Sequence, residues 1–325
     1  MVFALAGGAT PEFRCHRDSY LMKALNSIPI VVFGMVANLV VMIVSWKQWK
    51  TYNVCQKLIT TLAGFDLLFA IMKLIVSIPL LWTCQWIFGN FGCKTFGSVL
   101  GASSSIAIGL ILLISVERYI GITNPFTRGL SQSHILLGCL ATIVTAFVLM
   151  IPYTLNVHVS PVTLQCVDDW GEDLYPLVYY WMLLFVAFLA PIMVLLVVNY
   201  KIIRVVNHSL HFLGSHSNDV KMTSSQERQV MSSQERQMRH RHQENKRISR
   251  ILASLLIAFV MFVMPNKVYW LMKYHGLLRD LEDTEMNILI NVLDVCYSVH
   301  VSINPVIYSI IDVRFRKHLK GMFCY

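Results

Sequence analysis

The chain has 325 residues, of which 56% are hydrophobic and only 14% are charged, and its mean hydropathy is +0.58. Soluble domains carry roughly 25% charged residues, so this composition excludes an ordinary soluble protein and indicates a membrane protein. The net charge of +9 does not indicate a nucleic-acid partner, because most of the basic residues lie in loops beside long apolar segments. The first five residues carry no basic residue before a short apolar run, so we expect no cleaved signal peptide.

A helix needs about 20 apolar residues to cross the hydrocarbon core of a membrane, and seven segments of the chain meet this requirement. They span approximately residues 24–46, 55–81, 94–122, 134–155, 176–206, 246–273 and 286–310. Polar or charged segments separate every neighbouring pair. The sequence therefore predicts an all-α membrane protein, in which residues 24–310 form a bundle of seven transmembrane helices and residues 1–23 form an N-terminal segment.

The charged residues are distributed unequally between the two ends of the predicted bundle. Most of the 27 lysines and arginines lie close to the ends of the first, third, fifth and seventh spans. The segments on the other side carry eight of the 18 acids, namely Asp168, Asp169, Glu172, Asp173, Asp280, Glu282, Asp283 and Glu285. Because lysine and arginine are enriched in cytoplasmic loops, we expect a plasma-membrane protein with an extracellular N-terminus and a cytoplasmic C-terminus.

Two segments on the expected cytoplasmic side have distinctive sequences. The insert at about residues 207–245 contains a serine-rich hexapeptide twice, at 224–229 and at 232–237. It is either a mobile polar segment or a helical extension. The serines of the repeat are candidate phosphorylation sites. Residues 311–325 alternate basic and apolar side chains, which predicts a short amphipathic helix that lies in the membrane interface and contacts lipid. Cys324 is either a palmitoylation site or a plain terminal cysteine.

Polar residues and prolines recur inside the apolar spans, where ionisable groups are costly unless paired and are functional candidates by default. In chain order they are Asn38, Asp66, Glu117-Arg118-Tyr119, Pro125, Pro191, Pro265, Asn304-Pro305 and Tyr308. Taken alone, Glu117 and Arg118 could mark only a helix end. Together and in this order, these residues resemble those of the rhodopsin-like (class A) G-protein-coupled receptors across essentially the whole chain.

The resemblance implies a receptor that is not an enzyme, with a heterotrimeric G protein and arrestin as cytoplasmic partners. It implies that Glu117 pairs with Arg118 in the closed state, and that Arg118 is freed to receive the G protein when the sixth span swings outward. This is a two-state element that a ligand biases by its different affinity for the two states. The remaining switch residues implied are Tyr119, Pro125, Asn304, Pro305 and Tyr308.

A disulfide between Cys93 and Cys166 is also implied by the resemblance, and an oxidising exterior permits it. Cys15 and Cys84 are both expected outside, and whether they form a second bridge stays open. The remaining cysteines show no spacing typical of a zinc site.

An allosteric sodium ion at Asp66 and Asn304 is a further implication of the resemblance, and it is the one cofactor expected. A buried hydrogen-bonded pair is the alternative for these two residues. Ala107 and His300 stand where relatives have residues that support the ion, so the expected site is altered.

The ligand class follows from the loop at 166–176, which is acidic and resembles the second outer loop of orexin-type and neuropeptide Y-type receptors. Leu100 occupies the position of the aspartate that amine receptors need, and Ser298 that of the lysine that opsins need. Acidic outer loops attract a cationic ligand over long range, so we expect a cationic neuropeptide. The alternative is that these acids only solvate the loops.

The expected ligand pocket combines charges within the spans with aromatic and loop residues. Its candidates are Lys73, Asp168, Asp169, Trp170, Lys267, Tyr269, Trp270, Asn291, Asp294 and Tyr297. Lys73 and Asp294 are expected to form an internal ion pair. Lys267 and Lys273 could instead extend their ammonium groups toward the membrane surface.

The sixth span departs from the family pattern. Val263 replaces the usual tryptophan two residues before the proline, the fourth span has no tryptophan, and Asn199 stands where relatives place a tyrosine. The receptor fold is therefore better supported than ligand-driven activation. A constitutively active or decoy receptor remains an alternative, whereas a transporter is disfavoured because the spans show no internal repeat.

Overall fold

The structure is a computed structural model, and it describes residues 17–50, 52–123, 130–171, 174–219 and 225–323. Seven helical stretches are long and apolar enough to cross a membrane, at Ala24–Gln48, Val54–Thr83, Gly89–Thr123, Gln132–Asn156, Leu174–Val205, Gln243–Tyr274 and Thr284–Ile311. Each lies within a few residues of a span expected from hydropathy. The prediction of an all-α bundle of seven membrane-spanning helices is confirmed.

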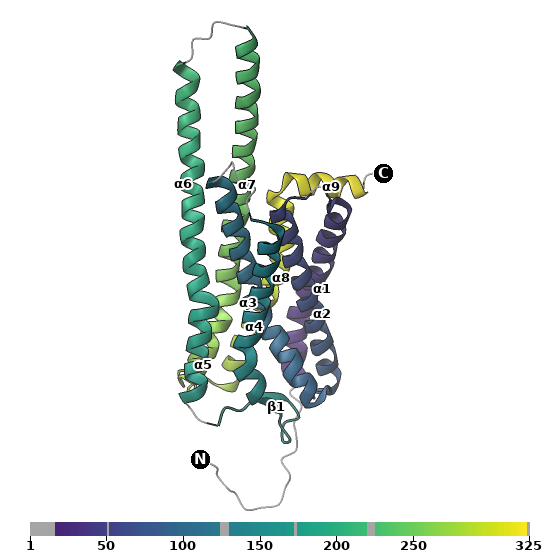
Figure 1. Ribbon diagram of the computed structural model, residues 1–325. Helices are drawn as coiled ribbons and strands as arrows, with labels where there is room; N and C mark the ends of the chain where they lie inside the picture. The colour runs from purple at the N-terminus through teal and green to yellow at the C-terminus, as the bar shows by residue number, and fades with distance from the viewer. Residues whose placement is uncertain (1–16, 51, 124–129, 172–173, 220–224, 324–325) are drawn as a thin grey trace, which may run out of the picture.

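The elements run in the order α1 (Arg17–Gln48), α2 (Val54–Thr83), α3 (Gly89–Thr123), α4 (Gln132–Asn156), β1 (Val157–Val159), β2 (Cys166–Asp168), α5 (Leu174–Leu184), α6 (Ala190–Asp219), α7 (Ser225–Tyr274), α8 (Asp283–Ile311) and α9 (Val313–Phe323). The sixth span thus belongs to α7 and the seventh to α8. One end of the bundle carries the β1–β2 hairpin, and we call it the hairpin end (Figure 1). The short helix α9 lies across the opposite end, which we call the α9 end.

The fifth span is one continuous helical path in which a π-helical turn, Phe185–Leu189, joins α5 to α6. Pro191 follows directly, and a proline lacks the amide hydrogen and crowds the carbonyl four residues earlier. A widened turn relieves that crowding without ending the helix. Hydropathy predicts the span but carries no signal for this turn.

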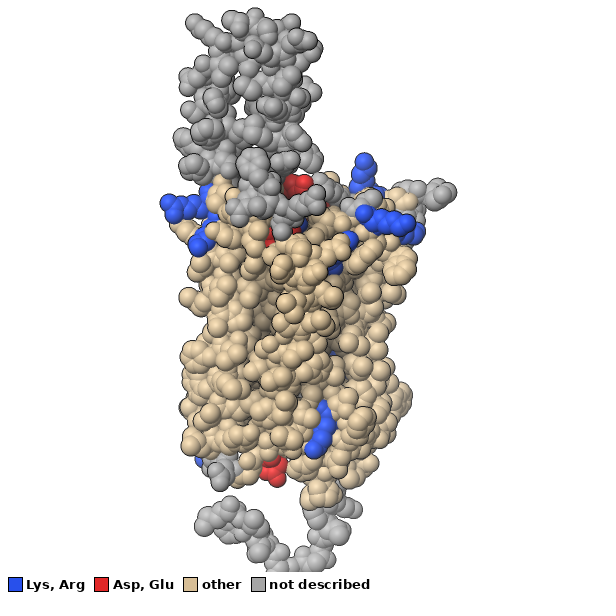
Figure 2. All heavy atoms as spheres, in the orientation of Figure 1, with Lys and Arg blue, Asp and Glu red and all other residues tan. Residues whose placement is uncertain are grey.

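The central helix of the bundle is α3, in which 56% of the most apolar stretch is buried, compared with 11% in α4. The exposed side chains of α4, such as Leu136, Val144 and Leu155, are apolar, as a lipid-facing surface requires. In the space-filling view, the middle of the visible face is almost uncharged, and lysines and arginines gather near the α9 end (Figure 2). This distribution agrees with a multi-pass membrane protein.

Helices α1 and α8 approach closely because a glycine faces a serine at their contact. A β-carbon on Gly34 would lie 2.4 Å from Ser302 Oγ, and Ser302 Oγ donates a hydrogen bond to the Ile30 carbonyl at 2.7 Å. Asn38 donates from Nδ2 to the Val301 carbonyl at 3.0 Å. Small residues and side-chain hydrogen bonds are the usual means of joining helices where no water drives them together.

The insert between the fifth and sixth spans is helical where it is described, because α6 continues to Asp219 and α7 begins at Ser225. The sequence allowed a mobile polar segment or a helical extension, and the described part is a helical extension. The extended ends of α6 and α7 project beyond the rest of the α9 end (Figure 1). The phosphorylation of its serines stays a prediction. The expected amphipathic helix is present as α9, and Cys324 lies outside the described residues.

Candidate functional site

The α9 end carries the charged pair expected from the third span. Glu117 and Arg118, near the end of α3, form an ion pair with 2.8 Å between Nε and Oε2, and their side chains are only 10% and 15% exposed. Their hydrogen-bonded contact, from Nη2 to Oε1, is longer at 3.4 Å, so charge attraction holds the pair more than an aligned hydrogen bond does. The Lys201 ammonium of α6 lies 5.8 Å from the Tyr119 ring centre. Pro125 lies outside the described residues.

A second ion pair at this end joins α7 to the junction of α8 and α9. Arg247 Nη1 lies 3.3 Å from Asp312 Oδ1, and the two side chains are 14% and 13% exposed. Asp312 Oδ1 also accepts a hydrogen bond from the Phe315 amide at 3.2 Å, so this side chain caps the start of α9 as well. The sequence reasoning missed this pair, although Asp312 is the one acid in its basic tail segment.

Halfway across the bundle, Asn304 of α8 donates from Nδ2 to Asp66 Oδ2 of α2 at 2.8 Å, and both residues are buried. A sodium ion needs several oxygen ligands, but here the Asn304 amide presents its nitrogen to the carboxylate. Ala107 offers no oxygen ligand from its side chain, and His300 contributes a ring nitrogen to the Tyr297 carbonyl. This donor set fits a sodium ion poorly, so the sodium site stays a prediction from the sequence alone.

Tyr308, the last residue of the switch motif in α8, is buried, and its hydroxyl has no hydrogen-bond partner among the described residues. A buried hydroxyl without a partner costs free energy. The structure therefore leaves Tyr308 with an unmet hydrogen bond that a rearranged bundle or a water molecule could satisfy.

Toward the hairpin end, Lys73 of α2 and Asp294 of α8 form the internal ion pair expected from the sequence. Their side chains are 18% and 24% exposed. The pair ties two helices together and neutralises both charges within the membrane-spanning part of the bundle.

A cavity of about 260 Å³ opens between α3, α4, α5, α7 and α8 on the same side of the bundle. Its polar and aromatic lining includes Tyr153, Tyr180, Asn266, Lys267, Trp270 and Tyr297. Of the ten expected pocket residues, Lys267, Trp270 and Tyr297 line it. Lys73 and Asp294 pair with each other instead, and neither lines the cavity.

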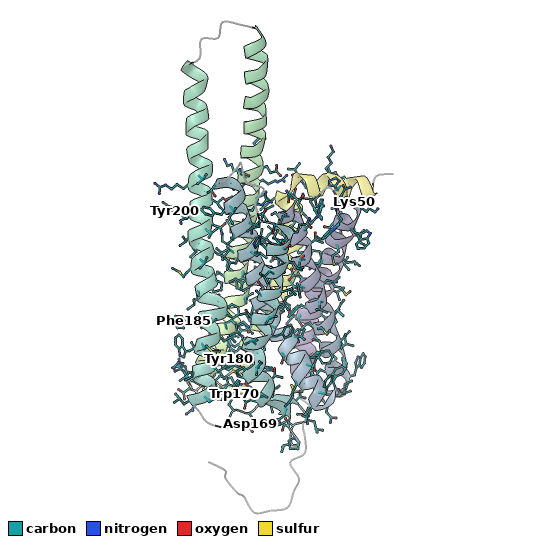
Figure 3. All side chains as sticks on the ribbon, in the orientation of Figure 1. Lys50, Asp169, Trp170, Tyr180, Phe185 and Tyr200 are labelled. Carbon is teal, nitrogen blue, oxygen red and sulfur yellow. A yellow bond between two sulfur atoms is a disulfide. The ribbon has the colours of Figure 1, made fainter. Side chains whose placement is uncertain are left out.

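Two tyrosines that line this cavity, Tyr179 and Tyr180, connect it to the segment that follows the hairpin. Trp170 packs against Tyr179 and Tyr180, with ring centres 5.0 Å and 5.9 Å apart. Figure 3 shows Asp169, Trp170 and Tyr180 at the hairpin end, with Lys50 and Tyr200 at the opposite end. The disulfide Cys93–Cys166, with 5.6 Å between Cα atoms, anchors the hairpin to α3 and confirms the expected bridge.

Asp168 connects the hairpin to α7. Its Oδ2 accepts hydrogen bonds from the Trp170 indole at 3.0 Å and from the Tyr274 hydroxyl, and Lys273 Nζ lies 3.9 Å from Oδ1. Asp169, in contrast, is exposed, and its carboxylate accepts a hydrogen bond from the Gly171 amide at 3.3 Å. The two neighbouring acids therefore have different roles, which the sequence did not separate.

Several residues near the cavity were either missed or placed differently by the sequence reasoning. Tyr153, Tyr179 and Tyr180 line the cavity, and the cluster of tyrosines after the acidic loop was the available signal. Tyr269 directs its hydroxyl to Met286 Sδ at 3.9 Å, and Asn291 Oδ1 is buried without a partner among the described residues. Cys84 is disulfide-bonded, but Cys15 lies outside the described residues, so whether these two cysteines pair stays open.

A second and larger cavity is a groove of about 730 Å³ on the outer side of α1 and α2, near Trp46, Trp49 and Lys50. Trp46 is 84% exposed there, so the groove opens toward the surroundings of the bundle and not into it. None of the expected pocket or switch residues lines it. The smaller cavity inside the bundle is therefore the better candidate ligand site.

Val263, which replaces the family's tryptophan, is fully buried in the core below the cavity. Aromatic bulk nearby comes from Phe188 of the fifth span and Phe259 of α7, whose stacked rings have centres 6.0 Å apart. Val263 and this stacked pair belong to the same buried core.

The chain matches the family described as 7 transmembrane receptor (rhodopsin family) over residues 37–308. It is 25% identical over 310 residues to the neuropeptide Y receptor type 6 of Oryctolagus cuniculus, a match that covers 89% of this chain and 77% of that receptor. It is 23% identical over 308 residues to the neuropeptide Y receptor type 1 of Xenopus laevis, with 90% and 78% covered. Members of this family are receptors and not enzymes, as the sequence predicted. With its seven spans and the family match over most of its length, the protein belongs to the rhodopsin family of seven-transmembrane receptors and resembles neuropeptide receptors.

Proposed function

We propose that this receptor binds an extracellular cationic peptide at the hairpin end and activates a heterotrimeric G protein at the α9 end. The observation that carries the proposal is that α3 and α7 each run from the cavity to a charged pair at the far end. A ligand that changes the packing of α7 at Trp270 can therefore change the position of Arg247 on the same helix. The neuropeptide Y receptors that the chain resembles support a peptide as the ligand class.

Exposed acids at the hairpin end support a cationic ligand. Asp169, Asp280, Glu282 and Glu285 are all exposed there, and their negative charges can attract a cation over long range. Asp168 is engaged by Tyr274 and Lys273, so we assign it to holding the hairpin and not to capturing the ligand. The orientation that follows has the hairpin outside the plasma membrane and α9 inside, where G protein and arrestin are reached.

The proposed activation step is an outward movement of α7 at the α9 end. This movement would separate Arg247 from Asp312 and open a space beside Arg118, whose side chain would then leave Glu117 and contact the G protein. Tyr308 has an unpartnered hydroxyl nearby that could support the open form. A ligand drives the step only by the difference between its affinities for the closed and open forms.

The test is G-protein nucleotide exchange in membranes that contain the receptor, with and without a set of arginine-containing peptides, each made both with an amidated and with a free C-terminus. We expect a peptide-dependent rise in exchange that Arg118→Ala abolishes at unchanged surface expression. A well-expressed receptor that gives no exchange with any peptide and none without peptide would contradict the proposed signalling function.

A constitutively active receptor is the second candidate, and Val263 is the observation that favours it. Without the tryptophan, a ligand has one fewer bulky group through which to shift α7. Exchange that is high without peptide, is unchanged by every peptide and is lost in Arg118→Ala would favour this candidate over a ligand-driven receptor.

A further inference from the structure

Lys267 is a positive charge that faces the cavity without a negatively charged partner. Two other cations within the apolar spans, Lys73 and Arg118, each have a carboxylate partner. None of the ion pairs among the described residues includes Lys267, and no hydrogen bond from its ammonium group is found there. An ionisable group in this setting is a candidate functional site whose partner has to be identified.

The contacts that Lys267 does make are with aromatic rings. Its Nζ lies 5.0 Å from the ring centre of Phe188 and 5.4 Å from that of Tyr297. Ring faces attract a cation, but they replace only part of the hydration that the ammonium loses on entering the bundle. A carboxylate would restore the rest through charge attraction and a charge-assisted hydrogen bond.

Lys267 does not reach the membrane surface. It lies two residues after Pro265 and seven residues before the end of α7 at Tyr274, which corresponds to about 10 Å along the helix axis. Its side chain lines the cavity together with Asn266 and Trp270. The ammonium group therefore does not extend toward the membrane surface, which was the alternative expected from the sequence. The charge is directed at whatever occupies the cavity.

The size and lining of the cavity limit the group that Lys267 can receive. Pockets that hold a complete small ligand measure roughly 300–1,000 Å³, so about 260 Å³ suits the end of a longer ligand. Tyr153, Tyr180 and Trp270 supply aromatic walls, and none of the described residues that line the cavity is a carboxylate. The complementary group is therefore negatively charged and sits beside an apolar or aromatic side chain.

We propose that Lys267 binds the carboxylate of a ligand residue that inserts into this cavity, such as a free peptide C-terminus with an aromatic side chain. This inference rests on the proposed function and specifies its ligand further. The part of the peptide that lies near the exposed acids of the hairpin end would be cationic, and the end that inserts into the cavity would be anionic. A peptide with an amidated aromatic end would lack the group that Lys267 requires.

The test uses two matched probes that differ only in charge, N-acetyl-phenylalanine and N-acetyl-phenylalanine amide. Binding of each to the purified receptor in lipid nanodiscs is measured by ligand-observed NMR titration. We expect the acid to bind at least about tenfold more tightly than the amide, as one charge-assisted contact allows. Lys267→Met should remove this difference, whereas Lys267→Arg should keep most of it.

Lys246→Met is the matched control, because this lysine is on the same helix but is exposed at the α9 end and does not line the cavity. The preference for the acid should survive there. Equal binding of acid and amide to the unaltered receptor, binding of neither, or an acid preference that persists in Lys267→Met would each overturn the proposal.

Thermal unfolding of the ligand-free receptor gives a second, independent readout. Lys267→Met removes an unpaired charge and should raise the unfolding temperature, whereas Lys73→Met leaves Asp294 unpaired and should lower it. A lower unfolding temperature in Lys267→Met would contradict the claim that its charge lacks a partner. No G protein takes part in either assay, so their failure would leave the proposed signalling function standing. A receptor that prefers the acid but never activates a G protein would contradict the signalling function alone.

Discussion

Arg247 on α7 and Asp312 at the start of α9 form an ion pair of 3.3 Å across the α9 end, with both side chains largely buried. The pair connects α7, the helix that is proposed to move, with the α8–α9 junction, which is proposed to stay in place. Under the proposed mechanism α7 cannot move away from α8 without separating these charges, so the pair would stabilise the closed form of the receptor over the open form.

Loss of the Arg247–Asp312 pair should raise signalling without ligand. Asp312→Asn removes the charge but keeps a side chain that can cap α9, and Arg247→Ala removes the other partner. A partly buried pair contributes about 1 kcal/mol to the free-energy difference between the closed and open forms. When few receptors are open, losing this contribution should raise the open fraction, and with it basal nucleotide exchange, roughly fivefold. Arg250→Ala, an exposed arginine on the same helix, is the control and should leave basal exchange unchanged. Unchanged basal exchange in both test variants would show that the pair does not restrain α7.

The Lys73–Asp294 pair should be important for stability, because each charge depends on the other inside the bundle. Removing one partner of a buried pair costs about 3–5 kcal/mol, and the partial exposure here reduces the expected cost to about 2–3 kcal/mol. Lys73→Met and Asp294→Asn should each lower the thermal unfolding temperature of the purified receptor. The double variant should recover part of the loss, since it leaves no charge behind. Additive losses would mean that the two residues act independently.

The sequence predicted the parts of this fold that depend on composition. Long apolar runs located all seven spans, and the order of Asp66, Arg118 and Pro305 identified the family before any contact was known. The Lys73–Asp294 pair was also predictable, because two opposite charges within apolar spans need partners.

The parts that depend on the relative position of distant residues were not predictable. Nothing in the sequence relates Arg247 to Asp312, which come together only when α7 packs beside the α8–α9 junction. Likewise, Asp168 and Asp169 are neighbours in one acidic loop, and only the structure shows that Asp168 alone is held by Tyr274. Contacts between helices are set by rotation and tilt, for which the hydrophobic pattern carries little information.

Gly34 should tolerate no larger residue, because α8 lies against it. In Gly34→Ala the new β-carbon would lie 2.4 Å from Ser302 Oγ and 3.3 Å from the Ser302 backbone. Overpacking of this kind costs about 1–3 kcal/mol, so the thermal unfolding temperature should fall. Gly121→Ala on α3 is the control, because a β-carbon there would meet no atom within 4 Å. Since alanine has the higher helix propensity, this variant should be as stable as the unaltered receptor or up to about 1 kcal/mol more stable. If both variants unfold alike, the close contact between α1 and α8 is not present.

Loss of the Cys93–Cys166 disulfide should loosen the hairpin and the Trp170 that follows it, which packs against the cavity-lining Tyr179 and Tyr180. The bridge closes a loop with a sequence separation of 73 residues, and loop-closure entropy limits its contribution to about 4 kcal/mol. Cys93→Ala with Cys166→Ala should lower surface expression and should weaken binding of the carboxylate probe even in molecules that reach the surface. Cys139→Ala, which removes a free thiol on α4, is the control and should do neither. A bridge-free receptor with unchanged probe binding would indicate that the hairpin does not shape the cavity.

The central claim is that α7 moves away from the α8–α9 junction when a G protein binds. Spin labels at Arg250→Cys on α7 and Lys317→Cys on α9, both exposed positions, report the distance between these helices by electron–electron resonance. The free thiols Cys55, Cys139 and Cys296, together with Cys324, which lies outside the described residues, are replaced first so that the labels attach at the introduced cysteines. We expect the distance to increase when nucleotide-free G protein is added, and to increase without it in Asp312→Asn. A distance that stays the same in a receptor that activates its G protein would contradict the claim.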